Sequence, residues 1–486
     1  MPKARDRRNE VLSGCLDELG WSPKAFARKL NRVFGVGTVA ESAPYHWRDT
    51  GGVPRSPLPA MAAYVLSQEL GRVISVEQLW QGRAADSPML IAADASLGHA
   101  WNVQGLGHIV EDWVLGGLLD RRRFLAISGS GLLAAVSHYL DGTAGRGAFG
   151  PRITEEGRTD PLVAQVEQNL PLLQLLDDEN GGARHLPYVG AQFRAVGLLL
   201  HEGAHSDKAT TRLIRALAEI GQLAGWMAFD SADHGLAQRY FVTALRAAHQ
   251  VNDRALCAHI LADMSFQAAT RGHPADAIAL GEAARRASEG GATGARASVL
   301  SRLAHAYATA GRGADFERTS DLARELIEGR STTEPEPRWM YFLTPNHLDC
   351  QAGYSLIGLG RSALAHGDRS MGRKLVRRGE ALLETGAYGV EKGDPSQRRA
   401  LFEGAWLALG YSASDELERA CDIARTAASR LATVRSPRST ALLRQLAVEL
   451  RRKRRNPHVG TLLPDFEEHL AKYAGSAAGP PDTVGA

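Results

Sequence analysis

The sequence predicts an all-α protein whose short helices pair into hairpins that stack on one another. The clearest pair is residues 221–249, where two amphipathic helices flank a polar turn. Small residues stand where the two backbones approach, and aromatic residues fill the remaining space: Trp226, Phe229, Tyr240 and Phe241. Glycine turns then recur, and Gly272 and Gly311 have the spacing of helix-hairpin repeats. No segment shows the apolar–polar alternation of a half-buried strand.

Residues 1–85 form the first predicted unit. Ser22 followed by Pro23 is a strong helix start, because serine caps the free N–H groups and proline suits the first helical position. Ser42 is expected to cap a second helix in the same way, and Ser75 with Gln78 forms a capping box. The predicted helices are 22–34, 42–50, 60–70 and 75–80.

Residues 86–160 are a mixed linker and docking region with three apolar pieces, at 91–101, 113–119 and 124–140. Residues 121–140 look like a twin-arginine signal, but they are internal and interrupted by Ser, Gly and His, so we interpret them as a buried or docking helix. The glycine-rich residues 142–157 are expected to be a flexible loop.

From Asp160 and Pro161 onward, helices and turns alternate up to residue 474, and residues 475–486 are expected to be a disordered tail. The turns are predicted at 232–235, 271–274, 310–313, 366–368 and 412–415. Helices are predicted to follow them at 237–245, 275–284, 316–327, 371–383 and 417–431. Residues 331–345 carry three prolines and are an insertion or extended loop. Its aromatic residues either pack the loop or line a ligand groove: Trp339, Tyr341 and Phe342.

The composition is that of a globular protein with a locally basic N-terminus. The whole chain has a net charge of +3, yet residues 1–60 alone hold ten Lys and Arg against six Asp and Glu. This excess fits a phosphate-binding module on a neutral scaffold. A second basic run, Arg451–Arg455, is either a solvated helix face or an auxiliary contact to phosphate or to a partner. Four scattered cysteines, no secretory signal and no membrane span favour a reducing, cytoplasmic location.

The N-terminal unit carries the functional signal, because its first two predicted helices can form a helix–turn–helix. Helix 42–50 would enter the major groove of double-stranded DNA, with Ser42, Tyr45 and His46 at base edges. The cations suited to phosphates are Lys24, Arg28, Lys29, Arg48 and Arg55. The seven residues Gly35–Glu41 are long for the turn, and a helical bundle for protein contacts is the alternative.

These segments, together with LAGWMAFDSADHGLAQRYFVTALRAAH, resemble actinobacterial transcriptional regulators that join a Cro/repressor-type helix–turn–helix to tetratricopeptide repeats. The negative regulators of Streptomyces differentiation and antibiotic production (the NsdA type) are the nearest named group. The resemblance implies a DNA-binding repressor with a right-handed tetratricopeptide-like superhelix. We expect a homodimer in which a small molecule or peptide in the repeat groove alters operator binding.

A competing signal is His201-Glu202-Gly203-Ala204-His205, which matches the HExxH pattern of zinc peptidases. Thr211 occupies the position of the further histidine in metzincins, and no third ligand is recognisable. We therefore interpret the match as a helix end followed by a turn, and expect no metal, cofactor or enzymatic activity. A repeat-based adaptor that does not bind DNA remains the second alternative.

Overall fold

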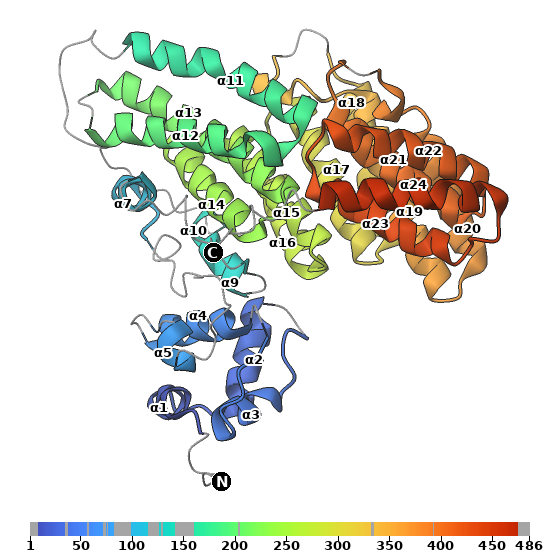
Figure 1. Ribbon diagram of the computed structural model, residues 1–486. Helices are drawn as coiled ribbons and strands as arrows, with labels where there is room; N and C mark the ends of the chain where they lie inside the picture. The colour runs from blue at the N-terminus through green and yellow to red at the C-terminus, as the bar shows by residue number, and fades with distance from the viewer. Residues whose placement is uncertain are drawn as a thin grey trace, which may run out of the picture.

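In a computed structural model, the chain is a small helical unit below a large curved stack of helices (Figure 1). The structure describes residues 8–474 except 35–36, 56–57, 71–73, 75, 82–98, 115–125, 128–129, 141–159, 203–204, 332–334 and 392. Within these ranges the regular elements are all helices, as the sequence predicts. None of the described helices is long and apolar enough to cross a bilayer. The predicted loop at 142–157 and tail at 475–486 lie outside the described residues.

The N-terminal unit contains five helices: α1 (Glu10–Glu18), α2 (Pro23–Phe34), α3 (Ala43–Asp49), α4 (Leu58–Leu70) and α5 (Val76–Trp80). Four of them were predicted, and α1 was not. Asn9 joins α1 to the rest, because its backbone N–H donates to the Arg48 carbonyl and its side chain donates to the Leu79 carbonyl. The Trp47 and Trp80 rings meet edge to face in the core beneath α3.

The connection between α2 and α3 is fixed by one asparagine. The Asn31 side chain donates to the Val39 carbonyl over 2.8 Å and accepts from the Val39 N–H over 2.9 Å. This pair of bonds holds the long turn against α2. The prediction that Ser42 caps α3 is wrong in one respect: Ser42 is at the N-cap position, but its side chain makes no capping hydrogen bond. Ser22, in contrast, accepts from the Ala25 N–H as expected.

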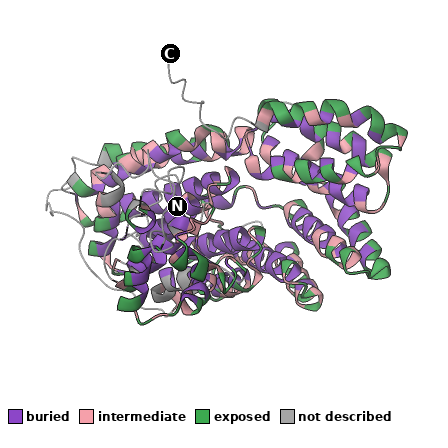
Figure 2. Cartoon of the chain, turned by 60° about the horizontal axis from the view of Figure 1, so that its bottom comes forward, coloured by how far each residue is buried: buried purple, intermediate pink, exposed green. Residues whose placement is uncertain are grey.

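The large domain is a stack of helical hairpins. Its helices are α11 (Asp160–Asn180), α12 (Gly182–Glu202), α13 (Asp207–Asp230), α14 (His234–Gln250), α15 (Arg254–Thr270), α16 (Pro274–Ser288), α17 (Thr293–Thr309), α18 (Gly313–Glu328), α19 (Pro345–Ala365), α20 (Arg369–Leu383), α21 (Gln397–Ala413), α22 (Leu417–Ser429), α23 (Pro437–Arg451) and α24 (Pro457–Ala474). From α13 onward each odd-numbered helix pairs with the next even-numbered one, and successive odd-numbered helices pack together. Buried residues fill the interior of the stack, and exposed residues follow its outer side (Figure 2). Each of the five predicted turns is followed by the predicted helix.

The hairpin turns share one backbone feature, a residue with positive φ shortly after the helix end. Glycine supplies it at positions 272, 311 and 367, whereas Ala232, Asn252 and Asp415 supply it elsewhere. The following helix is capped by an aspartate in three cases: Asp233, Asp253 and Asp368. The sequence signals at 271–274 and 310–313 therefore mark true hairpin turns.

The hairpin α13–α14 packs as its sequence predicts. A Cβ atom added to Gly225 would lie 2.6 Å from Cδ1 of Phe241, and one added to Gly221 would lie 3.1 Å from the Ala244 Cβ. Small residues therefore allow the close approach of the two helices. Phe229, Tyr240 and Phe241 are buried, whereas Trp226 is only partly buried because it faces a cavity described below.

Part of the predicted docking region lies against the first hairpins. Helix α7 (Val103–Val114) contacts α12 and α14, and α9 (Ser130–Ala135) contacts both α2 and α16; α10 (Ser137–Leu140) follows it. Ile127 is buried, and its backbone exchanges two 2.8 Å hydrogen bonds with the Gln238 side chain. Arg271 also donates to the Ile127 carbonyl over 2.9 Å. The described part of 126–140 is thus a docking segment, as interpreted from the sequence.

The stack closes into a ring, because its first helices contact its last. The Arg435 N–H donates to the Asn180 carbonyl over 2.7 Å, and α11 also contacts α21. Asp230, fully buried at the end of α13, accepts from the Ser436 hydroxyl over 2.8 Å and from Arg438 Nε over 3.1 Å. Its second oxygen lies 3.3 Å from the Gly182 N–H. One carboxylate therefore joins three distant segments of the chain.

Residues 335–344 fold back over the inside of this ring. The segment contains a short 3-10 helix, Arg338–Met340, and it is held by paired hydrogen bonds of 2.9 and 3.0 Å from Arg338 to Glu219. The buried Trp339 ring stacks on His259 with ring centroids 4.6 Å apart. The predicted loop is therefore an ordered wall of the interior.

Phe241→Ala is expected to lower the free energy of unfolding by about 3–5 kcal/mol, because the ring is fully buried between α13 and α14. Leu172→Ala is the matched control, since Leu172 is 61% exposed and its truncation should change stability by less than about 0.5 kcal/mol. Urea melts of the full chain measure both values. Equal stability of the two variants would contradict this packing.

Candidate functional site

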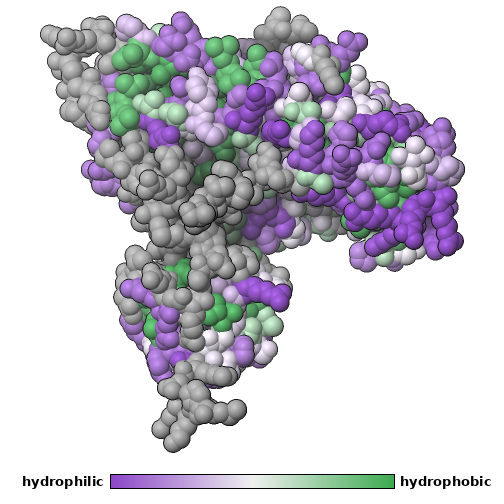
Figure 3. Space-filling view, viewed as in Figure 1, coloured by the Kyte–Doolittle hydropathy of each residue, from purple (hydrophilic) through white to green (hydrophobic). Residues whose placement is uncertain are grey.

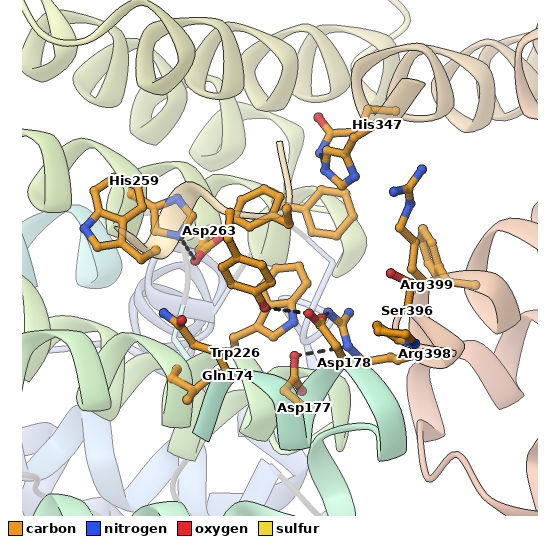
Figure 4. A pocket seen from close by; sticks show the side chains of 18 of the residues that line it. Gln174, Asp177, Asp178, Trp226, His259, Asp263, His347, Ser396, Arg398 and Arg399 are labelled. Carbon is orange, nitrogen blue, oxygen red and sulfur yellow. Dashed lines mark hydrogen bonds and ion pairs between the residues drawn. The ribbon is translucent and has the colours of Figure 1, made fainter. Parts of the chain in front are cut away.

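The ring encloses a cavity of about 460 Å³, within the size range of small-molecule sites (Figure 4). Its walls come mainly from the odd-numbered helices α11 to α23 and from the segment 335–344. We call it the ring cavity, and its lining residues include Gln174, Asp177, Asp178, Gln222, Trp226, His259, Asp263, Phe266, Arg302, Trp339, Tyr341, Phe342, His347, Gln351, Tyr354, Ser396, Arg398, Arg399, Phe402, Glu403 and Arg438.

Aromatic rings form the apolar part of the ring cavity. Trp226 of α13 and Phe266 of α15 are stacked with centroids 6.1 Å apart, and Tyr354 of α19 meets Phe402 of α21 edge to face at 5.3 Å. Trp339 closes the side nearest α15. Rings from four repeats therefore converge on one space, which a flat apolar group can enter.

Three arginines surround Trp226. The guanidinium carbons of Arg302, Arg438 and Arg398 lie 5.0, 5.3 and 5.5 Å from its ring centroid. Arg302 also lies 4.2 Å from the centroid of Phe266. Guanidinium groups stack favourably on aromatic faces, so the rings help to hold these buried cations in place.

Two of these arginines are neutralised by aspartates. Arg398 lies 3.1 Å from both Asp177 and Asp178, and Arg438 lies 3.1 Å from Asp230. Burial raises the pKa of Asp177 to about 7, against the opposing effect of Arg398. The Oδ1 atom of Asp177 has no hydrogen-bond partner among the described residues. Burial therefore opposes the charged form of this carboxyl group although Arg398 is next to it.

Arg302 is the least neutralised of the cavity cations. The nearest carboxylate, that of Asp263, is 3.9 Å away, and Asp263 already accepts a 2.7 Å hydrogen bond from Gln222. No hydrogen bond joins Arg302 to any other described residue, although only 8% of its surface is exposed. Its guanidinium is therefore a buried donor set that the protein itself leaves open.

A second chamber of about 560 Å³ adjoins the ring cavity and shares Phe266, Tyr354, Phe402 and Arg438 with it. His234 and His305 line this second chamber. Burial, together with the charges of nearby arginines, lowers their pKa values to about 4 and about 3. The Nδ1 atom of His305 lies 2.8 Å from the Ser355 hydroxyl oxygen. A neutral imidazole is therefore part of the wall of the second chamber.

The structure gathers most of the predicted DNA-contacting residues around α2 and α3. Tyr45 is 40% exposed on α3, and Ser42, His46 and Arg55 are exposed as well. His46 is oriented by a 2.9 Å contact between its Nδ1 and the Thr50 hydroxyl. Helix α3 lies at the end of the unit that faces away from the repeats (Figure 1).

Four of the five predicted phosphate-binding cations have carboxylate partners in the free protein. Lys24 and Arg28 both lie 2.9 Å from Glu41, and together they hold its pKa below the usual value. Arg48 pairs with its neighbour Asp49 at 2.7 Å. Lys29 turns the other way, to Glu69 of α4 at 2.6 Å, so it is separated from the other three.

The HExxH match is a helix end, as interpreted from the sequence. Helix α12 ends at Glu202, and His205 lies beyond it, where its Nε2 bonds to the Leu199 carbonyl. His201 and His205 are therefore not on one helix, which is the arrangement that the peptidase motif requires. The described residues contain no group of three side chains suited to a metal ion.

Sequence reasoning missed the ring cavity apart from its loop aromatics. The available signal was the presence of charged residues inside otherwise apolar helices, such as Asp263 in α15 and Arg302 in α17. It also missed a row of exposed cations on α20, where Figure 3 shows a hydrophilic surface. We call this row the α20 cationic face; Arg369, Arg373, Lys374 and Arg377 form it, and none pairs with a carboxylate among the described residues.

Comparison with known proteins gives no family assignment. No protein-family model and no curated protein matches the chain. The chain is similar to two crystal structures of nearly identical TPR-like repeats of a putative kinesin light chain from Podosopora anserina. One, of a form with a single substitution, is 17% identical, with a TM-score of 0.28 over 44% of this chain and 95% of that one. The other is 15% identical, with a TM-score of 0.28 over 45% and 96%. The resemblance to actinobacterial regulators finds no support in the two sequence comparisons.

Protonation of His305 should destabilise the ring in acid. Because its folded-state pKa lies below that of the unfolded chain, its contribution to stability is present above about pH 6.5 and is lost as the pH falls. The stability difference between wild type and His305→Phe should change by about 1.4 kcal/mol per pH unit between pH 6 and 4. Urea melts across this range measure it, with His366→Phe as an exposed control. A constant difference would contradict the buried, neutral imidazole.

Proposed function

We propose that the protein is a non-enzymatic, DNA-binding regulator whose repeat ring senses a ligand. The observation that carries the proposal is the combination of a ring cavity with an N-terminal unit that is connected to the same ring through α9. The sequence resemblance adds repression of development or secondary metabolism as the regulated process. A homodimer with two N-terminal units would contact two half-sites of an operator.

The geometry of α2 and α3 supports DNA contact. Lys24 and Arg28 are on one side of α2, next to the start of α3, and Tyr45 and His46 project from α3 into solvent. The pairing of the two cations with Glu41 is no obstacle, because exposed ion pairs contribute little and phosphates can replace the carboxylate. Helix α3 would then lie in the major groove with α2 across the backbone.

The docking segment supplies a route from the ring to the N-terminal unit. Helix α9 touches α2 on one side and α16 on the other. Just before it, Ile127 is fixed by Gln238 of α14 and by Arg271 at the end of α15. A ligand that alters the packing of α15 would therefore also shift the segment on which α2 rests, and so bias the spacing of two DNA-binding units.

An adaptor is the second candidate, favoured by the α20 cationic face. Its four cations lie within the first three turns of one helix, and a partner with an acidic segment would complement them. Such a partner would bind the outside of the ring, far in the chain from α2 and α3. The two candidates therefore assign binding to different sets of cations.

Joint replacement of Lys24, Arg28 and Arg48 by alanine is expected to weaken binding to duplex DNA. The slope of the logarithm of the binding constant against the logarithm of the salt concentration should become shallower by about one for each lost phosphate contact. Fluorescence anisotropy with fragments of the gene's own promoter, at several salt concentrations, measures both quantities. The effect arises because these cations replace counterions on the backbone.

The matched control is Arg369, Arg373 and Arg377 replaced by alanine, which removes the same formal charge from the α20 cationic face. This variant should bind DNA like wild type. Equal losses in the two triple variants would indicate nonspecific attraction to a basic protein. No salt-dependent DNA binding by the wild type would contradict the regulator and leave the adaptor.

A further inference from the structure

We infer that the ring cavity binds a small organic anion: a flat apolar body that carries one carboxylate, sulfonate or phosphate group. The inference rests on the proposed sensory function and names the chemical class of its ligand. Arg302 would receive the anionic group, and the rings of Trp226, Trp339 and Phe342 would enclose the body. All four residues line the same cavity.

Arg302 is suited to the anion because its pairing within the protein is incomplete. It is nine-tenths buried, it makes no hydrogen bond to another described residue, and its nearest carboxylate is 3.9 Å away. The rings of Phe266 and Trp226 fix the plane of the guanidinium. A preorganised, desolvated guanidinium binds an oxyanion through two parallel hydrogen bonds, more strongly than one in water.

The other cavity cations are less available for this role. Arg398 is shared between Asp177 and Asp178, Arg438 is held by Asp230, and Arg399 is bonded to Glu403. An anion would have to displace a buried carboxylate from any of them, which leaves that carboxylate uncompensated. At Arg302 the anion breaks no existing hydrogen bond, because Asp263 lies 3.9 Å away and is bonded to Gln222 instead.

A cationic ligand fits the same walls poorly. Guanidinium carbons already lie 4.2 Å from the Phe266 ring centroid and 5.0 and 5.3 Å from that of Trp226, so an ammonium group near these rings would meet like charge. The cavity volume of about 460 Å³ accommodates a bicyclic body.

Two fluorescent probes with the same kind of apolar body test this inference on the full chain. 8-Anilinonaphthalene-1-sulfonate carries a sulfonate, whereas N-phenyl-1-naphthylamine does not. We expect one sulfonate probe per chain, bound about tenfold or more tightly than the neutral probe. Arg302→Gln should remove that preference by weakening only the sulfonate probe, because a charge-assisted hydrogen bond is lost. Arg373→Gln, on the exposed surface, should leave both affinities unchanged.

A second variant guards against a fold defect in Arg302→Gln. Gln174 of α11 lines the ring cavity (Figure 4). Gln174→Trp should fill part of the cavity and reduce the binding of both probes without changing the urea midpoint. Equal affinity for the two probes, or a sulfonate affinity unaffected by Arg302→Gln, would overturn the inference. So would binding that survives Gln174→Trp. If DNA binding persists in any of these cases, only the ligand class is wrong and the DNA-binding role stands.

Discussion

The contact between Asp230 and Arg438 is the interaction on which the rest of the large domain depends. The carboxylate is fully buried and meets Arg438, Ser436 and the backbone of Gly182, so it joins the first hairpins to the last. A buried charge that loses its partner is strongly destabilising, commonly by about 3–5 kcal/mol. An open helical array needs no such contact, because each repeat is stabilised by its neighbours alone. The presence of this network makes the stack a closed ring with an interior.

Closure also determines the chemistry of that interior. The odd-numbered helices bring their polar residues to one centre, where water is largely excluded and charge must be neutralised within the protein. Arginines meet this requirement by combining aromatic stacking with aspartate pairing, as Arg398 and Arg438 do. Arg302 is the exception, because its nearest carboxylate is 3.9 Å away and its N–H donors make no hydrogen bond to another described residue. The proposed sensing and DNA binding would be linked through α9, which contacts both α16 of the ring and α2.

The sequence predicted the local features of this protein well. The helix start at Ser22 and Pro23, the turns at Gly272 and Gly311 and the close packing of Phe241 depend on neighbouring residues and were all found. Helix α1 was missed. Its buried face is completed by contacts to α3 and α5, which come later in the chain. Ring closure and the cavity could not be predicted, because Asp230 and Arg438 are far apart in sequence and neither stands in a recognisable motif.

Hydrogen–deuterium exchange on Asp230→Ala tests the closed ring most directly. The account predicts faster exchange in two distant regions at once, the α11–α12 turn around Asn180 and the segment around Arg435, because both depend on the same carboxylate. Protection in α17 and α19, on the opposite side of the ring, should remain close to that of the wild type. Faster exchange confined to the end of α13 would contradict the account, since it would show that the first and last repeats are held together without Asp230.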